Sequence, residues 1–507
     1  MTLLELTPDE AREFLLCSEQ YCNFRLPEYF NFSSVLDYAR KSIGSKDESQ
    51  LFVKDEKGKL IYPSNYDGIN YLLFSNKDGK LDYRPLSLIN PFYYYLLVRL
   101  ITTPMNWTII VSRFKELKNS HFSVPSIPVV KKTKRDKASI WIWWDQVEQQ
   151  SIQMSLRYKY MFVTDITNCY GSIYTHSISW ALMGKPEAKQ QKNNKDLLGN
   201  KLDIMFQGMQ YGQTNGIPQG NVVSDLFAEL VLAYADDLIS KKVKENGITD
   251  YCVIRYRDDY RVFSNSKEQL EAFSLIMQKE LANLNFRINS AKTAIIEDLV
   301  LGSIKADKVA LMSSFLHRIE LPLTNRCKKN LTVPQKELIA IYSFSKQFPN
   351  SGSVERLLGS FYDWLQRKKN RLNDWHALSA ILISIAKENP RTYAIVAAII
   401  SLFIDKVPKE DRENLIIEII KRVSSFPNSS LLLIWLQRIS LGINLSVDYK
   451  DPLCRAIIGE SVSLWENSWL LPNYYQGFTN NLFISQNVID KMKVSIDKKA
   501  VSPFSNY

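Results

Sequence analysis

Three aspartates carry the clearest chemical signal in this sequence. Asp165 follows a run of β-branched and aromatic residues, 160–164, that predicts a buried strand. Asp258 and Asp259 lie between two further strand-like stretches, within residues 255–263, as at the turn of a hairpin. Carboxylates that converge from two strands repel one another unless a cation neutralises them, and hard oxygen ligands favour Mg²⁺ or Mn²⁺. Two such ions about 3.5–4 Å apart can drive in-line phosphoryl transfer, which is the chemistry of polymerases.

A second Tyr-x-Asp-Asp occurs at residues 234–237. Asp237 precedes Lys241 by four residues, the spacing of an ion pair on a helix surface. We therefore expect Asp236 and Asp237 to be structural, and the copy at residues 256–259 to be the catalytic one. The apolar residues around the second copy recur with helical spacing, at Val223, Leu226, Phe227, Leu230, Tyr234 and Leu238.

The acids need a rigid sheet to hold them, and strand-like stretches occur only in the first 300 residues or so. After about residue 306 the pattern consists of amphipathic helical runs separated by prolines. We predict an α+β fold with two domains, residues 1–305 and an all-helical domain at residues 306–507.

The helical part contains a repeated tetrapeptide. Phe-Pro-Asn-Ser occurs at residues 348–351 and again at 426–429, and Pro390 lies between the two copies. The proline spacings of 41 and 37 residues resemble the period of HEAT or armadillo helix pairs. A non-repetitive helical bundle would also accommodate them, so the pattern leaves both arrangements open.

Composition sets limits on the class of protein. The 507 residues carry a formal net charge of +11, which permits a polyanionic partner without requiring one. Six cysteines without a CxxC pair and four histidines argue against a zinc site or a disulfide framework. The sequence opens on a helix-capping pattern, Thr7 to Glu10, and its longest apolar run, 393–404, is shorter than the roughly 20 residues that span a bilayer. We expect a soluble cytoplasmic protein with no membrane segment.

A basic run precedes the first acidic motif. Residues 131–137 contain five lysines and arginines, and Trp141, Trp143 and Trp144 follow. Such a run is commonly a solvated loop. Interleaved with aromatic residues, it could also contact phosphates.

Four motifs in order resemble those of reverse transcriptases, over roughly residues 80 to 300. Asp165 with Tyr170 resembles the first palm motif of that family, and residues 216–220 (Gly-Ile-Pro-Gln-Gly) resemble the second. Residues 256–259 resemble the third motif, and residues 284–293, which include Lys292, resemble the fourth. The resemblance implies a fingers and palm domain that transfers nucleotides with Mg²⁺ or Mn²⁺.

The resemblance also implies roles for single residues. Asp165, Asp258 and Ile166 would bind the metal ions, and Asp259 would support the site. These three aspartates would form the catalytic set.

Three further residues would contact the nucleotide. Tyr170 matches the steric-gate position, where a ring beneath the sugar excludes a 2′-hydroxyl, although a packed core aromatic would look the same. Gln219 would lie against the incoming nucleotide, or simply belong to a Gly-Pro turn before a helix. Lys292 could stabilise the triphosphate or protonate the pyrophosphate, although a lysine in a loop is often only solvated.

A narrower resemblance links the chain to bacterial abortive-infection (Abi) polymerases, of the AbiK and prophage-encoded kinds. It is carried by residues 165–178 and 84–93. The resemblance implies phage defence and a reverse-transcriptase-like palm joined to a C-terminal HEAT-like domain. It also implies untemplated synthesis from deoxynucleoside triphosphates, priming from a tyrosine that leaves single-stranded DNA covalently attached, and a homo-oligomer.

Two alternatives remain at this point. The chain could be an RNA-templated defence-associated or retron-like reverse transcriptase, or a catalytically inactive scaffold. Retention of all three acids speaks against the scaffold, because a scaffold has no need for repelling carboxylates at one point.

Overall fold

The computed structural model describes residues 1–77, 81–130, 142–320, 334–367 and 375–501, with the side chains of residues 314–320 excepted. The basic run at residues 131–137 and Trp141 therefore lie outside the described residues. Within the described ranges, no helix is both long enough and apolar enough to cross a lipid bilayer.

A five-stranded sheet, in the order β3-β5-β6-β4-β7, forms the centre of the N-terminal part. Its neighbours pair antiparallel, except that β3 lies parallel to β5. The strands are rich in Val, Ile, Tyr and Phe, which pack well on a pleated surface. Their bounds are β3 Phe122–Ser123, β4 Tyr160–Asp165, β5 Cys252–Tyr256, β6 Asp259–Ser264 and β7 Ala294–Ile296.

Helices cover both faces of this sheet. Met161 and Phe263 point to the face under η3 (Trp143–Gln149), α8 (Gln150–Met154) and α15 (Leu299–Ser303). Their neighbours Phe162 and Val262 belong to the main core on the other face, where α13 (Val222–Glu245) and α14 (Lys267–Ala282) pack. Successive residues of a strand face opposite sides of the sheet. When helices cover both faces, the sequence of each strand is therefore apolar at nearly every position.

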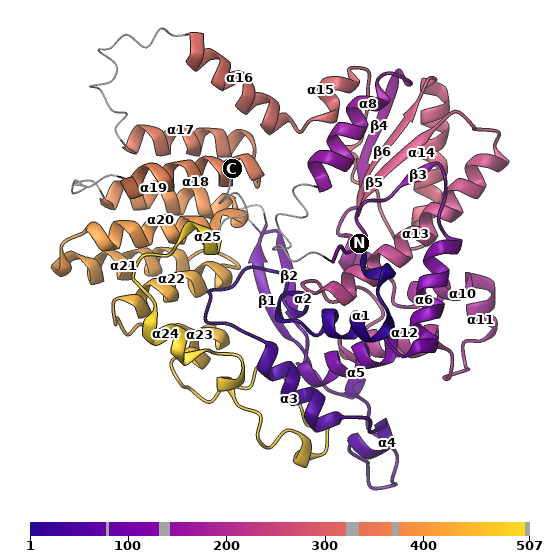
Figure 1. Cartoon of the computed structure of the whole chain (residues 1–507), viewed down its shortest axis with the longest axis horizontal. Coiled ribbons are helices and arrows are strands. Elements are labelled where there is room, and N and C mark those ends of the chain that lie inside the picture. The colour runs from indigo at the N-terminus through magenta and orange to yellow at the C-terminus, as the bar shows by residue number, and fades with distance from the viewer. Residues whose placement is uncertain (78–80, 131–141, 321–333, 368–374, 502–507) are drawn as a thin grey trace.

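A separate hairpin of β1 (Tyr71–Asn76) and β2 (Tyr83–Leu88) lies between the palm sheet and the C-terminal helices (Figure 1). The predicted capping pattern near the N-terminus is confirmed, since α1 (Pro8–Leu15) begins after Thr7, whose side chain accepts from Glu10 N. The other helices before residue 305 are α2 Ser18–Tyr21, α3 Ser33–Ile43, α4 Glu48–Leu51, α5 Pro91–Ile101, α6 Pro104–Glu116, α9 Cys169–Ser172, α10 His176–Met183, α11 Lys185–Gln190 and α12 Leu198–Gly208.

The expected change to helices after residue 305 is confirmed. Within the stack each helix packs on the helix two places further along, so that α17 contacts α19 and α18 contacts α20. Helix α20 is buried on every face, which explains why its sequence is apolar throughout. The helices are α16 Ala306–Glu320, α17 Pro334–Gln347, α18 Gly352–Arg367, α19 Trp375–Glu388, α20 Tyr393–Lys406, α21 Lys409–Ser424, α22 Ser430–Gly442, α23 Pro452–Ile457, α24 Gln486–Lys491 and α25 Lys498–Val501.

Both copies of the Phe-Pro-Asn-Ser tetrapeptide contact the β1–β2 hairpin. Asn350 and Asn428 adopt left-handed backbone conformations, with φ of 56° and 53°, which asparagine tolerates better than most residues. Asn350 Nδ2 donates to the Lys77 carbonyl oxygen, and Asn76 N donates to the Asn428 carbonyl oxygen at 3.0 Å. The repeated turns therefore fix the end of the hairpin to the stacked helices.

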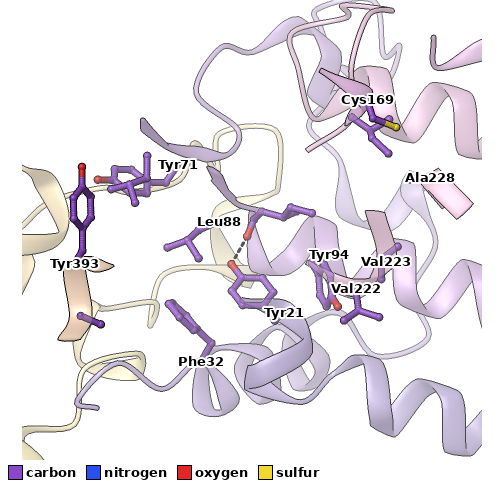
Figure 2. Close-up of a cluster of buried hydrophobic side chains, with 14 of the residues drawn as sticks. Tyr21, Phe32, Tyr71, Leu88, Tyr94, Cys169, Val222, Val223, Ala228 and Tyr393 are labelled. Atoms are coloured by element: carbon purple, nitrogen blue, oxygen red, sulfur yellow. Dashed lines mark hydrogen bonds between the residues drawn. The ribbon is translucent and has the colours of Figure 1, made fainter. Parts of the chain in front are cut away.

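The N-terminal part and the helical part share one apolar core. Figure 2 shows a portion of it, in which Tyr21 donates to the Ile89 carbonyl and Tyr71 of β1 belongs to the same cluster as Tyr393 of α20. The ion pair between Arg25 and Glu355, at 2.5 Å, joins the same two parts. The position of a domain boundary at residue 306 remains a prediction. Side chains from before and after this position pack into one continuous core.

Candidate active site

The three aspartates of the sequence prediction meet at one end of the palm sheet. Asp165, the last residue of β4, pairs with Asp259, the first residue of β6. Asp258 lies beside them in the two-residue turn between β5 and β6, and its carbonyl oxygen accepts from Ile166 N at 3.1 Å. Arg257 makes this tight turn possible by adopting a φ of 55°. Backbone pairing therefore fixes the relative positions of all three carboxylates.

Burial and mutual repulsion disfavour the ionised forms of Asp258 and Asp259 when no cation is bound. Burial raises the pKa of Asp258. Burial, and then the charge of Asp258, raises the pKa of Asp259 to about 6. Asp165 Oδ1 is buried without a hydrogen-bond partner among the described residues. A buried, unpartnered carboxylate oxygen beside two further acids is where a hard cation would relieve both desolvation and repulsion.

Lys292 lies beside Asp165. Its ammonium pairs with Asp165 Oδ2, and Asn289 N donates to the Asp165 carbonyl oxygen at 2.9 Å. Burial favours the neutral amine, but the hydrogen bond with Asp165 and its charge hold the pKa of Lys292 above the usual range. Lys292 thus neutralises one oxygen of Asp165 and leaves the other, Oδ1, to a different partner.

Two side-chain carboxylates and a backbone carbonyl fit a metal site here. No group of three His, Cys, Asp or Glu side chains in the described part of the chain has the arrangement of a complete metal centre. Asp165 and Asp258 supply the carboxylates, and Ile166, whose amide bonds to Asp258, lies next to both. A hard divalent ion accepts carbonyl, water and phosphate oxygens for its remaining positions, so the donor set suits Mg²⁺ or Mn²⁺.

Tyr170 reaches the site from α9 and is held at its hydroxyl. Its Oη donates to Asp225 Oδ1 at 2.5 Å, and Arg257 of the catalytic turn lies 3.6 Å from Asp225 Oδ2. Burial, and then the Asp225 charge, raises the pKa of Tyr170, so the phenol stays protonated. The ring is therefore anchored to the same helix, α13, that supports the palm.

Gln219 lies between the first motif and the β1–β2 hairpin. Its carbonyl oxygen accepts from Ser87 N at 2.7 Å, while Ile217 N donates to the Tyr170 carbonyl oxygen at 3.0 Å. Gly220 has a φ of 124°, and a Cβ there would lie 3.2 Å from the Ser87 carbonyl oxygen, so glycine allows this close approach. The second motif thus joins the gate residue to the hairpin.

The second Asp pair lies on helix α13, as predicted. Asp237 pairs with Lys241 at 2.7 Å on the helix surface. Asp236, however, is buried and bonds to Arg255 Nε at 2.7 Å and to Tyr260 Oη at 3.0 Å. Because Arg255 and Tyr260 belong to β5 and β6, Asp236 lies underneath the catalytic hairpin. The sequence signal for this role was Arg255 itself, a charged residue inside a strand of otherwise apolar character.

No signal in the sequence pointed to Lys305, which lies beside the acids. The ammonium of Lys305 lies 4.0 Å from the centre of the Trp143 ring, and that ring packs edge-on against Tyr256 at 5.2 Å. The sequence left open whether the basic run and the tryptophans after it contact phosphates or form a solvated loop. Trp143 instead supports the start of the catalytic turn, and Trp144 is exposed.

Residues 76–312 match the family described as reverse transcriptase (RNA-dependent DNA polymerase). Residues 76–312 are thus similar to a reverse transcriptase domain. The matched segment contains the three acids, Tyr170, Gln219 and Lys292. No curated protein matches the sequence.

Several solved structures resemble the chain weakly. Apo telomerase from Candida tropicalis is 15% identical, with 80% of this chain and 74% of that chain covered and a TM-score of 0.30. The form truncated from the C-terminal domain is 14% identical over 54% of this chain and 58% of that chain, also at 0.30. Telomerase from Candida albicans in complex with a telomeric RNA fragment is 11% identical over 79% and 67%, at 0.29. Scores this low establish no common arrangement of the whole chains.

Proposed function

We propose that the chain is an anti-phage DNA polymerase of the abortive-infection type, which adds deoxynucleotides at a two-metal site. The observation that carries the polymerase activity is the pairing of Asp165 with Asp259, with Asp258 in the adjoining turn, in a reverse transcriptase domain. The buried Oδ1 of Asp165, without a partner among the described residues, supports a metal there. Polymerases of this kind generally use Mg²⁺ or Mn²⁺.

In this reaction a hydroxyl attacks the α-phosphorus of a deoxynucleoside triphosphate, a new P–O bond forms, and pyrophosphate leaves. Bound metal ions would lower the pKa of the attacking hydroxyl and neutralise the leaving oxygen. Asp165, Asp258 and the Ile166 carbonyl would hold those ions, and Asp259 would support the set. Lys292, protonated beside Asp165, is placed to donate a proton to the departing pyrophosphate.

Tyr170 and Gln219 would select and position the nucleotide. Tyr170 presents a ring whose hydroxyl is already used by Asp225, so the ring cannot turn freely away from the sugar. A fixed ring at this place excludes a 2′-hydroxyl sterically, which favours deoxynucleotides. Gln219 lies on the loop that joins this gate to the β1–β2 hairpin.

The helical part supports the HEAT-like assignment within this proposal. Helices α17 to α22 pack on alternate neighbours, as stacked helix pairs do. The repeated Phe-Pro-Asn-Ser turns both hydrogen-bond to the hairpin, one through the Asn350 side chain and the other through the Asn428 carbonyl oxygen. We assign residues 306–507 to this domain, and residues 1–305 to the fingers and palm. A homo-oligomer in the cytoplasm belongs to the same proposal.

The resemblance at residues 84–93 and 165–178 supports synthesis without a template, primed by a tyrosine that keeps the single-stranded product attached. The second candidate, an RNA-templated defence-associated or retron-like reverse transcriptase, is supported by the family match itself, whose description names RNA-dependent synthesis. The two differ in what the enzyme needs besides deoxynucleotides.

The test is incubation of the purified chain with Mg²⁺ and each labelled deoxynucleoside triphosphate, without nucleic acid. Label that migrates with the protein under denaturing conditions and is released by nuclease supports the first candidate. Label incorporated only after RNA and a primer are added, with a product complementary to that RNA, supports the second. Absence of product in both conditions contradicts both.

A further inference from the structure

Two basic side chains lie close to the three acids, and a third lies close to both of these cations. Arg84 is on β2, Lys305 immediately precedes α16, and Arg391 is in the short helix η5 (Pro390–Thr392). All three retain exposed surface, although protein closely surrounds Arg84 and Lys305, and in the part of the chain that the structure describes none forms an ion pair with Asp or Glu. They come from three separate segments: the hairpin, the end of the palm and the helical stack.

Backbone pairing relates the side chain of Arg84 to that of Gln219 in the second motif. Arg84 lies opposite Ser75, on the same face of the hairpin as Leu86, because alternate residues of a strand share a face. Leu86 in turn pairs with Gln219. The side chains of Arg84, Leu86 and Gln219 therefore point to the same face.

Stacking on an aromatic ring places Lys305 beside the catalytic turn. Its ammonium lies 4.0 Å from the centre of the Trp143 ring, which packs against Tyr256. Tyr256 is the residue that precedes the Arg257-Asp258 turn. A cation held this way keeps its charge and its freedom to bind an anion.

Hydrogen bonds join the turn that carries Arg391 to both neighbouring segments. Asn389 Oδ1 accepts from Asn350 N at 2.7 Å, and Asn350 Nδ2 donates to the Lys77 carbonyl oxygen at the end of β1. Ser353 and Ser351 at the start of α18 donate to Asp307, two residues after Lys305. Helix η5 itself packs against α18. Arg391 is thus tied to the hairpin of Arg84 and to the segment of Lys305.

Charge effects place Arg84 and Lys305 close to the acids, and Arg391 close to both of these cations. Burial, and next the charge of Arg391, lowers the pKa of Arg84, while Asp258 opposes this. Burial lowers the pKa of Lys305 against the effect of Asp259, and Arg391 adds to the lowering. Like charges held together by a fold are destabilising until an anion lies between them.

We propose that Arg391, with Lys305 and Arg84, binds the triphosphate of the incoming nucleotide, so that the helical part completes the nucleotide site. This rests on the proposed function, because the acids then hold metal ions that bridge to the same phosphates. A polyphosphate fits better than a strand backbone, since the three cations lie close together and two of them lie near the acids where the α-phosphate must react. Guanidinium groups also match phosphate oxygens in geometry.

The inference is tested by calorimetric titration of the full chain with inorganic tripolyphosphate in the presence of Mg²⁺. R391Q and K305Q each should weaken binding about tenfold or more, as expected for loss of one charged hydrogen bond. The matched control is R422Q on α21, where Arg422 lies over Phe426, and it should stay within about twofold. R391K should retain part of the affinity, and melting curves should show that each variant is folded.

Unchanged tripolyphosphate affinity in both R391Q and K305Q would overturn the inference, as would failure of the parent chain to bind this anion. Weaker binding of an oligothymidylate with unchanged tripolyphosphate binding would also overturn it, because the cluster would then be a strand site. The titration needs no synthesis. Loss of the anion site and absence of polymerase activity can therefore be told apart.

Discussion

The hydroxyl of Tyr170 donates a hydrogen bond of 2.5 Å to Asp225, and Asp225 also lies 3.6 Å from the guanidinium of Arg257 in the catalytic turn. The Tyr170 ring and the turn that bears the acids are therefore fixed through one carboxylate. The orientation of Tyr170 and the placement of the acids depend on the same buried residue of α13.

Loss of this carboxylate should relax the choice of sugar. D225N weakens the acceptor for Tyr170, so the ring gains freedom and ribonucleotides should be incorporated about 10-fold more readily relative to deoxynucleotides. Y170A should relax selection further, by about 100-fold, whereas Y170F keeps the ring and should change it less. The ratio of kcat/KM values for the two sugars measures the effect. The same kcat/KM ratio in the parent and in Y170A would refute the steric-gate role of Tyr170.

Stability should depend on pH through Asp259. Its pKa is raised to about 6 in the folded chain, so the folded state binds more protons than the unfolded state between about pH 4 and 6. The favourable contribution is present below this window and is lost as pH rises through it. Without divalent metal, D259N should therefore be about 1 to 2 kcal/mol more stable than the parent at pH 7.

Denaturant unfolding in EDTA at pH 4.5 and 7 measures this difference. Mg²⁺ should raise the stability of the parent and leave D259N less affected, since the metal relieves the same repulsion. A D259N variant with the same pH dependence as the parent would contradict the assignment of strain to this carboxylate.

The two aspartates of the helical Tyr-x-Asp-Asp should behave differently. D236N leaves the buried Arg255 with one carboxylate fewer, so unfolding free energy should fall by about 3 kcal/mol and synthesis should fall with it. D237N removes a surface pair with Lys241 and should change stability by less than about 1 kcal/mol. Urea unfolding and synthesis assays on both variants check this. A D237N variant more damaged than D236N would reverse the assignment.

Lys292 should affect turnover more than substrate affinity. K292Q removes the protonated amine beside Asp165, and kcat should fall about 10- to 100-fold because proton donation to pyrophosphate is lost. K292R should restore part of the activity and shift the alkaline limb of the pH profile upward. A K292Q variant with unchanged kcat and raised KM would indicate a binding role only.

The sequence predicted the hairpin turn that carries Asp258 well because its determinants are local. Strand propensity on both sides of Asp258, and helical spacing around Asp236, separated the two Asp pairs correctly. The buried link from Asp236 to Arg255 could not be predicted, since it joins residues that meet only after α13 packs under the sheet. Contacts of Lys305 with Trp143 depend on packing in the same way.

In the helical part, too, local features were predictable from the sequence and long-range contacts were not. Proline spacing and amphipathic runs predicted helices after residue 306, and the repeated tetrapeptide marked two turns that both contact the hairpin. Nothing in the sequence indicated which element those turns would touch, because the hairpin lies more than 250 residues earlier. The closeness of Arg391 to Arg84 and Lys305 depends on this packing.

The central claim is that Asp165, Asp258 and Asp259 catalyse metal-dependent nucleotide addition. The most direct measurement is incorporation of labelled deoxynucleotide in Mg²⁺ by the parent, D258N and D237N, with melting curves for each. The account predicts that D258N stays folded and loses at least about 1000-fold of the activity, while D237N keeps it. Comparable activity in D258N and the parent, or loss confined to D237N, would contradict the account.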